Sequence, residues 1–410
     1  MNKSANKHSI AIVGGGAAGI TVAASLRRRR PDLDIALIDP ATDHYYQAAF
    51  TLVGGGTFDL ARTRRSQQDL IPPGVDWIRQ PAEGFDPGNT SVILADGRHI
   101  TYDGLIVCPG LQLDWDRIEG LQETLGQNAV CSNYAPELAA YTWDCIRDLR
   151  GGTALFTQPQ MPIKCPGAPQ KIAYLAADHL RRSGSLDDTE IRFALSGDVI
   201  FSVQEFVAPL QAVAARYGIH VDYATTLVAV DGAAREAVFE TTAANGESER
   251  VTRRFDLLHV TPPQSAPDFV KQSPLANDAG WVDVDQQSLQ HKQYPNIFAL
   301  GDAAATPNSK TAAAVRLQAP VVVENLLAAL DGKPLPAEYD GYASCPLVTA
   351  HGRVILAEFI YGGKVTPSFP LDPTRERRSM WWLKKHFLPF LYWNIMLKGR
   401  HWDIPHRPRE

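Results

Sequence analysis

The sequence predicts an α/β protein with two Rossmann-like domains and a C-terminal region of different character. The chain has 410 residues, which is enough for two domains of ordinary size and an appendage. A glycine-rich turn joins an early apolar run to a helical run, as in a Rossmann unit. Aromatic and basic residues gather near the C-terminal end. Hydrophobic residues make up 45% and charged residues 21%, which indicates an ordered globular chain.

The first element is a strand–helix–strand unit that ends in an acid. Residues 10–13 form an apolar run that predicts a buried strand, and residues 20–30 have the pattern of a helix. Residues 35–38 predict a second strand, which Asp39 follows directly. In a dinucleotide-binding unit, an acid at this position accepts hydrogen bonds from ribose hydroxyls.

The turn of this unit, residues 14–19, carries the G-x-G-x-x-G fingerprint. Its glycines allow a tight turn and the close approach of a pyrophosphate, whose charge the helix N-terminus stabilises. A glycine-rich turn without a ligand is the alternative, but the strand, the helix and the acid together favour a dinucleotide. The candidate contacts are Gly14, Gly16, Ala17, Ala18 and Gly19.

Two later segments indicate which dinucleotide binds. Residues 105–110 predict a strand followed by a turn. Residues 294–302 predict an apolar strand that ends in Gly-Asp, and a helical run, residues 310–330, comes after it. With the glycine fingerprint before them, these segments resemble the two-dinucleotide-binding-domain flavoproteins, whose cofactor is FAD.

The resemblance to these flavoproteins implies further cofactor contacts. Asp302 is expected to bind the ribityl chain of FAD, and Gly110 belongs to the expected cofactor-binding set. The following helix is expected to point its positive end at the flavin pyrimidine ring, which stabilises an anionic reduced flavin. Lys310 is the candidate residue at that ring, with an ordinary first-turn lysine as the alternative.

The same superfamily implies that the second α/β domain is inserted in the first. We expect an FAD-binding domain formed by residues 1–111 and 286–330, and an inserted Rossmann-like domain at residues 112–285. Residues 331–410 form the remaining C-terminal region. Inside the inserted domain, the candidates are strands at residues 192–195 and 218–223 and a helix at residues 201–217.

The inserted domain lacks the glycine motif that a second nucleotide requires. Its first candidate strand is residues 153–157, and the loop after it, residues 158–169, contains four prolines and no triple-glycine turn. This loop argues against NADH or NADPH as the electron donor. Cys165 lies in the loop, beside Lys164 and just before a predicted helix, where the pKa of a thiol should fall. A buried, inert cysteine is the alternative.

Two long motifs around cysteines carry a second, more specific resemblance. They are residues 163–171, with Cys165, and residues 339–349, with Cys345. Together they resemble the sulfide:quinone oxidoreductases, and the mitochondrial-type branch is the most similar. The similarity runs from about residue 10 to about residue 400. Further similar stretches are residues 44–47, 51–54, 258–263, 309–315 and 389–394.

This resemblance implies that Cys165 and Cys345 form a disulfide beside the flavin. Hydrosulfide would attack one sulfur and leave a persulfide there and a thiolate on the partner, which passes two electrons to the flavin. The reduced flavin would then reduce a membrane quinone. We expect Cys165 to face the flavin and Cys345 to carry the persulfide. Gln47 and the turn around Ala82 are expected near FAD.

The other three cysteines are expected to be structural. Some branches of the family use a third cysteine near the position of Cys131, but the residues after it resemble the two-cysteine branch. Cys108 ends a predicted strand and Cys145 lies in a helical run, so both are expected in the core.

The C-terminal region predicts contact with a membrane surface. Aromatic and basic residues together suit an amphipathic helix in the headgroup layer, where a quinone can be reached. A helix packed on the body or in a dimer interface is the alternative. Phe390 and Tyr392 are candidate quinone contacts. The tryptophans of this region are Trp381, Trp382, Trp393 and Trp402.

The sequence also predicts several absences. No apolar stretch reaches the ~20 residues of a membrane span, and the N-terminus has no signal-peptide core. We therefore expect a peripheral, monotopic protein of a bacterial inner membrane. The net charge of −5 argues against nucleic acid, and the run of residues 27–30 is expected to lie at a helix C-terminus, facing water. No metal site is expected.

The predicted activity is sulfide oxidation with a quinone as the acceptor. The alternatives are an NADH:quinone oxidoreductase of the same fold and a non-catalytic flavin redox sensor. The sequence leaves the sulfur acceptor open among sulfide, sulfite, glutathione and coenzyme A. It also leaves the quinone and the oligomeric state open, and a homo-oligomer is compatible with it.

Overall fold

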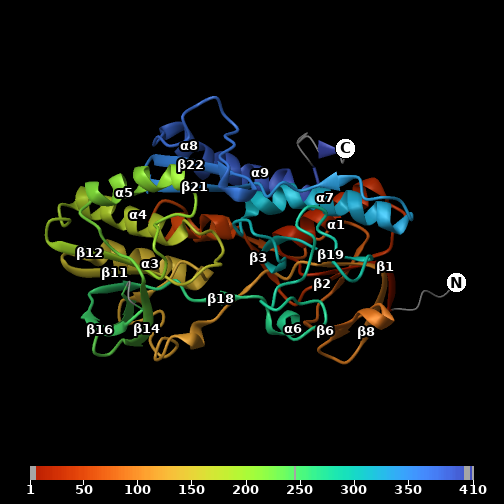
Figure 1. Cartoon of the computed structure of the whole chain (residues 1–410), viewed down its shortest axis with the longest axis horizontal. Helices are drawn as coiled ribbons and strands as arrows, with labels where there is room; N and C mark the ends of the chain where they lie inside the picture. Colours follow the sequence, from red (N-terminus) through yellow and green to blue (C-terminus); the bar gives the residue numbers. More distant parts are fainter. Residues whose placement is uncertain (1–5, 244–245, 401–406, 409–410) are drawn as a thin grey trace.

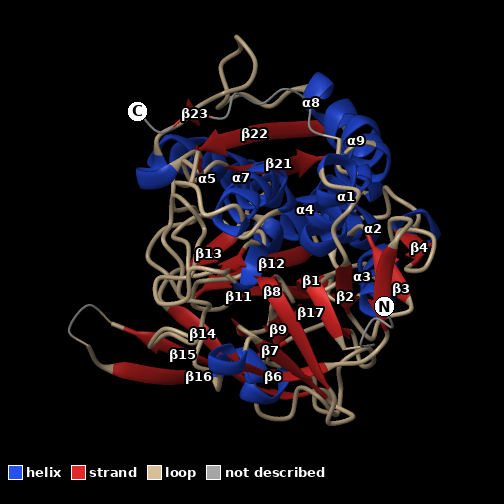
Figure 2. Cartoon of the chain, turned by 90° about the vertical axis from the view of Figure 1, so that its right-hand side faces the viewer, coloured by secondary structure: helices blue, strands red, loops and turns tan. Residues whose placement is uncertain are grey.

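Two α/β bodies lie side by side, and the C-terminal helices cross above both of them (Figure 1). The computed structural model describes residues 6–243, 246–400 and 407–408. Figure 2 shows most of the helices as a layer between the sheets and the hairpin formed by β21 (Ala343–Ala350) and β22 (Arg353–Phe359). The core of each body is therefore closed on one side by helices and on the other by the remaining strands and loops.

The first body is built on a seven-stranded sheet with the order β5-β2-β1-β8-β7-β6, in which β19 also pairs with β8. Strands β1, β2, β5, β8 and β19 are parallel to their neighbours along this path, as in a Rossmann sheet. The strands are β1 (Lys7–Val13), β2 (Ile35–Ile38), β5 (Val75–Ile78), β6 (Ala82–Asp86), β7 (Ser91–Leu94), β8 (His99–Val107) and β19 (Ile297–Ala299).

Two helices cover one face of this sheet. Helix α1 (Ala17–Arg29) follows β1, and α7 (Ala312–Leu330) packs against α1. Helix α7 begins where Thr311 accepts a hydrogen bond from the Ala314 amide, an N-cap that the sequence supplies locally. Ile10, Ile12 and residues of both helices share one buried cluster, so alternate residues of β1 face the helices.

The second body is built on a parallel five-stranded sheet with the order β10-β17-β11-β12-β13. Its strands are β10 (Val130–Cys131), β11 (Gly152–Gln158), β12 (Thr189–Leu195), β13 (His220–Asp222) and β17 (Leu257–His259). Helices α3 (Pro136–Asp148), α4 (Ala168–Ser183) and α5 (Val207–Arg216) belong to this body, and a separate antiparallel sheet is formed by β14 (Thr225–Asp231), β15 (Glu236–Thr242) and β16 (Ser248–Arg254).

The C-terminal region touches both bodies. The antiparallel hairpin of β21 (Ala343–Ala350) and β22 (Arg353–Phe359) packs on α4. A bent helical segment follows, with α8 (Arg378–Trp382), a π-helical turn at Leu383–Phe387 and α9 (Leu388–Asn394). The turn after α9, Met396–Lys398, lies against α1.

The remaining elements are short. They are β3 (Asp43–Tyr45), α2 (Phe50–Gly54), β4 (Arg64–Ser66), β9 (Gln112–Leu113), β18 (Gln264–Ser265), α6 (Asp268–Lys271), β20 (Ala337–Glu338) and β23 (Arg407–Pro408), with 3₁₀ turns at Gln47–Ala49, Leu60–Thr63, Pro87–Asn89, Trp115–Arg117, Gln204–Phe206, Gly301–Ala303 and Tyr361–Gly363.

Two local expectations differ from the structure. The helix expected at residues 201–217 is a 3₁₀ turn at Gln204–Phe206 followed by α5, and Phe201 and Val203 lie buried in the core before the turn begins. Contrary to the expectation about spans, α7 is long and apolar enough to cross a membrane, with a mean hydropathy of 1.4. Because 61% of that window is buried and α7 packs on α1 and the sheet, it is a core helix of the first body.

The basic run at the end of α1 has structural partners. Arg27 donates hydrogen bonds to the carbonyl oxygens of Pro31 and Leu33. Arg29 pairs with Glu324 and Arg30 with Asp32. These contacts fit the expected role of the run as a helix C-terminus.

Candidate active site

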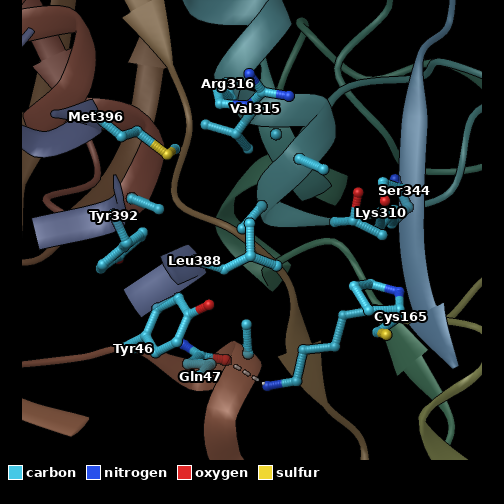
Figure 3. Close-up of a pocket in the computed structure, with 18 of the residues that line it drawn as sticks. Tyr46, Gln47, Cys165, Lys310, Val315, Arg316, Ser344, Leu388, Tyr392 and Met396 are labelled. Atoms are coloured by element: carbon cyan, nitrogen blue, oxygen red, sulfur yellow. Dashed lines mark hydrogen bonds between the residues drawn. The ribbon is translucent and has the colours of Figure 1, made fainter. Parts of the chain in front are cut away.

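A cavity of about 470 Å³ lies where the carboxyl ends of both sheets meet the C-terminal helices (Figure 3). Its wall combines residues of the glycine turn, the cysteine loop, the start of α7 and the π-helical turn. The cavity therefore joins the predicted cofactor, sulfur and quinone residues in one space. The predicted residues that line this cavity include Gly16, Ala17, Ala18, Gln47, Gly110, Cys165, Asp302, Lys310 and Tyr392.

The three fingerprint glycines have two different functions. Gly14 has a φ of +107°, and a side chain there would collide with the backbone at Cys108. A side chain at Gly19 would collide with the Gly14 carbonyl, so these two glycines permit the strand and helix to pack. A β-carbon at Gly16 would meet no atom within 4 Å, and this residue lines the cavity. The space at Gly16 and the amides at the start of α1 fit a pyrophosphate.

Asp39 lies directly behind the glycine turn. Its carboxylate accepts hydrogen bonds from the amides of Gly15 and Ala41, and its backbone carbonyl accepts one from the Trp77 indole. Burial raises the pKa of Asp39. Among the described residues no cation pairs with this carboxylate, so hydroxyl donors of a ribose suit it.

Lys310 is buried and precedes Thr311, the N-cap of α7, so it is not a residue of the first helical turn. Its ammonium donates hydrogen bonds to the carbonyl oxygens of Asp302 (2.6 Å) and Ala304 (3.3 Å) and lies 3.9 Å from the centre of the Trp281 ring. Burial lowers the pKa of Lys310 to about 8. Burial also raises the pKa of Asp302, and the charges of Lys310 and Lys164 oppose that shift.

The cysteine pair is assembled from two distant segments. The Sγ atoms of Cys165 and Cys345 are 3.6 Å apart, although 180 residues separate them in sequence. Cys165 precedes α4 and Cys345 lies in β21, which packs on α4. Cys165 has a left-handed φ of +53°, and its amide donates a hydrogen bond to the Lys310 carbonyl (2.8 Å). Such a conformation in a non-glycine residue persists only where the surroundings hold it.

A buried lysine contacts both sulfurs. Lys171 on α4 is 2% exposed, and its Nζ is 3.0 Å from Cys165 Sγ and 3.6 Å from Cys345 Sγ. A hydrogen bond from Cys345 and the charge of Lys171 hold the pKa of Cys165 well below its usual range. The pKa of Cys345 is raised by the hydrogen bond to Cys165 and by burial. The site therefore favours a thiolate on Cys165 and a thiol on Cys345.

Two lysines at this site were not identified from the sequence. Lys171 lies within the first cysteine motif and on α4, a helix with many buried positions. A lysine in such a helix is the sequence signal that could have identified it. Lys384 of the π-helical turn is also buried and lines the cavity, and its ammonium donates to the Ala48 carbonyl (2.8 Å). Burial lowers the pKa of Lys384 to about 8.

Near the C-terminal helices, Tyr392 lines the cavity but its hydroxyl is already bonded. It lies 2.6 Å from Nε2 of His44, whose Nδ1 faces Oε1 of Gln67 (3.3 Å). Burial lowers the pKa of His44 to about 4, so the ring is neutral near neutral pH, and Tyr392 donates to it. Gln67 in turn donates to the Gly15 carbonyl (2.8 Å). Tyr392 is therefore linked to the glycine turn.

Six predicted residues lie outside the cavity wall, namely Gly14, Gly19, Asp39, Ala82, Cys345 and Phe390. Phe390 is 54% exposed because it lies on the outer face of α9, whereas Leu388 and Leu391 face the cavity. Ala82 begins β6 and pairs with Leu94, and it is not among the residues that line the cavity. The structure thus places Phe390 on the outer face of α9, outside the cavity, and Ala82 in a sheet strand.

Among the described residues, the other three cysteines make no hydrogen bond to the pair, although Cys108 lines the same cavity as Cys165. Cys108 is buried with a raised pKa, and its Sγ is 3.7 Å from the Gly14 carbonyl oxygen. Cys131 is buried in β10 and interacts with Cys145 rather than with Cys165. Cys145 was expected in the core, but it is only partly buried and packs against the core from its edge. No group of three metal-binding side chains occurs in the part of the chain that the structure describes.

The glycine turn, the Gly-Asp element and a thiol pair at one cavity define a flavin-dependent disulfide oxidoreductase. A family model described as pyridine nucleotide-disulphide oxidoreductase matches residues 8–138. The chain is 40% identical over 400 residues to the mitochondrial sulfide:quinone oxidoreductase of Mus musculus, covering 98% of this chain and 88% of that protein. It is 42% identical over 401 residues to the protein of the same name from Dictyostelium discoideum, covering 97% and 88%. The chain belongs to the sulfide:quinone oxidoreductase family.

A solved structure supports the fold independently. The sulfide:quinone oxidoreductase of Aquifex aeolicus superposes with a TM-score of 0.78 at 20% identity, covering 97% of this chain and 92% of that one. The predicted fold class and family are thus confirmed, and so are an FAD cofactor, sulfide as the substrate and a quinone as the acceptor. The two alternative activities gain no support from these relatives.

The expected location in a bacterial inner membrane is wrong. The relatives from Mus musculus and Dictyostelium discoideum are both named as mitochondrial proteins, and they match nearly the whole chain. The expectation depended only on the lack of a signal-peptide core and on the aromatic C-terminal region. Neither observation distinguishes one membrane from another, which is why the prediction failed.

Proposed function

We propose that Cys165 and Cys345 carry out sulfide oxidation, with Cys165 facing FAD and Cys345 carrying the persulfide. The observation that supports this most is the 3.6 Å contact between the two sulfurs beside the buried Lys171. Cys165 lines the cavity, whereas Cys345 is fully buried behind it. The opposite directions of their pKa shifts favour the same assignment.

The reaction begins from a disulfide between these cysteines. Hydrosulfide forms a sulfur–sulfur bond with Cys345 and loses its proton, the Cys165–Cys345 bond breaks, and the electron pair stays on Cys165. Lys171 stabilises the resulting thiolate and so makes Cys165 a better leaving group. FAD, when bound, supplies the acceptor for this electron pair and the route to the quinone.

The residues that would hold FAD are those of the first body. Gly16, Ala17 and Ala18 offer the α1 N-terminus to the pyrophosphate, and Asp39 offers its carboxylate to a ribose. We assign Asp302, with Gln47, Gly110 and Lys310, to the flavin end of the cofactor. Gln47 accepts a hydrogen bond from Lys164 (2.8 Å), so its amide is already oriented.

The quinone would enter between the C-terminal helices. Leu388 and Leu391 supply an apolar wall, with the Tyr46 ring beside Tyr392 (4.6 Å between centres). Reduction of a quinone consumes protons, and Lys384 can supply one near neutral pH because its pKa is lowered to about 8. Tyr392 acts here through its ring, since its hydroxyl is bonded to His44.

We propose that the same region lies on a membrane surface, with the mitochondrial relatives pointing to a mitochondrial membrane. Trp382 (59%) and Phe390 (54%) are large apolar side chains exposed to solvent, and Phe369 and Leu371 are exposed as well. Lys385 lies over the Trp381 ring, which adds a cation to this surface. Trp402, which was part of the prediction, lies outside the described residues.

The sulfur acceptor and the domain boundaries are finer proposals. Burial of Cys345 favours the small nucleophiles, sulfide and sulfite, over glutathione and coenzyme A. We retain the division into residues 1–111 with 286–330, 112–285 and 331–410, because the seven-stranded and five-stranded sheets fall within the first two units.

Stopped-flow flavin reduction tests the assignment of the two cysteines. Anaerobic sulfide should bleach the flavin of the wild-type holoenzyme, and NADH at the same concentration should not. In Cys345→Ser no persulfide can form at the assigned carrier, so bleaching should be lost while bound FAD remains. Bleaching that survives in this variant would contradict the proposed role of Cys345.

A further inference from the structure

Three parallel strands of the second body end beside the cysteine loop. Residues after β10, β17 and β11 lead to Tyr134, Thr261 and the segment with Lys164 and Cys165, respectively. In open α/β sheets ligands bind outside the carboxyl ends of the strands. Here the loop has no glycine fingerprint, so this edge is not built for a pyrophosphate. It does contain polar groups that the fold itself does not satisfy.

Three buried side chains at this edge have a polar atom without a hydrogen-bond partner in the described structure. They are the Tyr134 hydroxyl, the Thr261 hydroxyl and the Nε2 of Gln264, in residues that are 4%, 1% and 7% exposed. A buried polar group without a partner destabilises a fold by roughly 1–3 kcal/mol. Three such groups together indicate that a small polar ligand binds among them.

Lys164 links these residues to the reacting sulfur. Its amide donates to Oε1 of Gln264 (2.8 Å), which leaves Nε2 as the free end of that side chain. Its ammonium donates to the Tyr134 carbonyl (3.3 Å) and lies 5.7 Å from the centre of the Tyr134 ring. Cys165 is the next residue, and Tyr134 lines the same cavity.

The charges near Tyr134 support this connection. Burial raises the pKa of Tyr134, and the charges of Cys165 and Cys345 raise it further, so its hydroxyl lies within electrostatic reach of both sulfurs. The Thr261 side chain opposes the shift, which places it beside Tyr134, although the two hydroxyls do not meet the geometry of a hydrogen bond. Asp302 is the acid of this region. Burial raises its pKa, and the positive charges of Lys310 and Lys164 lower it.

We propose that Tyr134, Thr261 and Gln264 form a subsite that holds hydrosulfide next to the cysteine pair before it reacts. Two hydroxyls and an amide supply three hydrogen-bond donors, and Lys164 adds a cation, which suits a small anion. The subsite positions the substrate and takes no part in bond making. This inference rests on the proposed function, because it assumes that sulfide reacts at Cys165 and Cys345.

The test is anaerobic stopped-flow flavin reduction over a series of sulfide concentrations. In Tyr134→Phe the half-saturating sulfide concentration should rise about tenfold, the loss expected for one hydrogen bond to a charged ligand, with a limiting rate within about twofold of wild type. Thr261→Val should change the same quantity in the same direction. It provides a second variant if Tyr134→Phe folds poorly.

Tyr102→Phe is the matched control. Tyr102 is also buried with an unpartnered hydroxyl, but it lies in β8 of the first body. The half-saturating sulfide concentration of Tyr102→Phe should equal that of the wild-type enzyme. An unchanged value in both Tyr134→Phe and Thr261→Val would overturn the subsite, as would a change confined to the dependence on sulfite. If sulfide fails to bleach the wild-type flavin, the proposed function fails instead.

Discussion

The two bodies begin alike, with a buried parallel strand, a loop and a helix, but the two loops support different chemistry. After β1 the chain passes through Gly14–Gly16 directly into α1, and the helix N-terminus is open to the cavity. After β11 a longer loop, residues 159–167, carries prolines, Lys164 and Cys165 before α4 begins. The first loop suits a phosphate, and the second presents a sulfur to the same cavity.

One fold can thus serve both halves of an electron transfer. The carboxyl ends of both sheets face one cavity, so a change of loop alone converts a nucleotide position into a thiol position. The glycine loop is tied to α9 through Gln67, His44 and Tyr392. The cysteine loop is tied to Lys310 before α7 and to β21.

The largest expected effect comes from the cysteine loop. Cys165→Ser removes the proposed leaving group and should slow flavin reduction by sulfide roughly a thousandfold or more, because a hydroxyl cannot replace the thiolate. Stopped-flow absorbance measures this rate. The variant should keep its FAD, since the glycine loop is untouched. Loss of FAD together with activity would show that the two loops are not independent.

A substitution in the glycine loop should weaken FAD binding, which Cys165→Ser should leave intact. Gly16→Ala fits the protein without a clash, but its methyl group occupies the space assigned to the pyrophosphate. We expect FAD affinity to fall about tenfold or more while the apoprotein unfolds at the same temperature. Flavin titration and thermal melting measure the two quantities. Gly19→Ala is the contrast, because its methyl group collides with the Gly14 carbonyl and should destabilise the fold.

Lys171→Met tests the electrostatics of the cysteine loop. A hydrogen bond from Cys345 and the charge of Lys171 lower the pKa of Cys165, and the Cys165 thiolate released from the disulfide is the form that reduces the flavin, which persists above that pKa. Removing the cation raises the pKa, so the rate should fall roughly tenfold near neutral pH and recover as the pH rises. Flavin reduction measured across a pH series checks this, with Lys171→Arg as the control that keeps the charge. A loss of equal size at every pH would indicate a structural defect instead.

The smallest expected effect lies in the link between α9 and the glycine loop. Tyr392→Phe leaves the buried Nε2 of His44 without its donor, which should lower the free energy of unfolding of the holoprotein by about 1 kcal/mol. Urea unfolding followed by flavin fluorescence measures it. Tyr102→Phe removes a hydroxyl that has no partner and should be neutral. Equal effects of both variants would contradict a specific role for the link.

The sequence by itself determined the features that depend on neighbouring residues. The first unit was predictable as a strand, a glycine turn, a helix and Asp39. Dinucleotide binding requires these parts at short, fixed spacings along the sequence. The missing second fingerprint was visible in the same way, as was the long motif around each cysteine. Family resemblance then supplied the pairing of Cys165 with Cys345.

Only the tertiary structure decided which charged and polar groups surround the two sulfurs. Lys171 contacts both of them because β21 packs on α4, and Lys384 reaches the cavity from the far end of the chain. The outward position of Phe390 depends on how α9 is rotated against the body. Burial and long-range packing set these positions and the resulting pKa shifts, and neither is encoded in local sequence spacing.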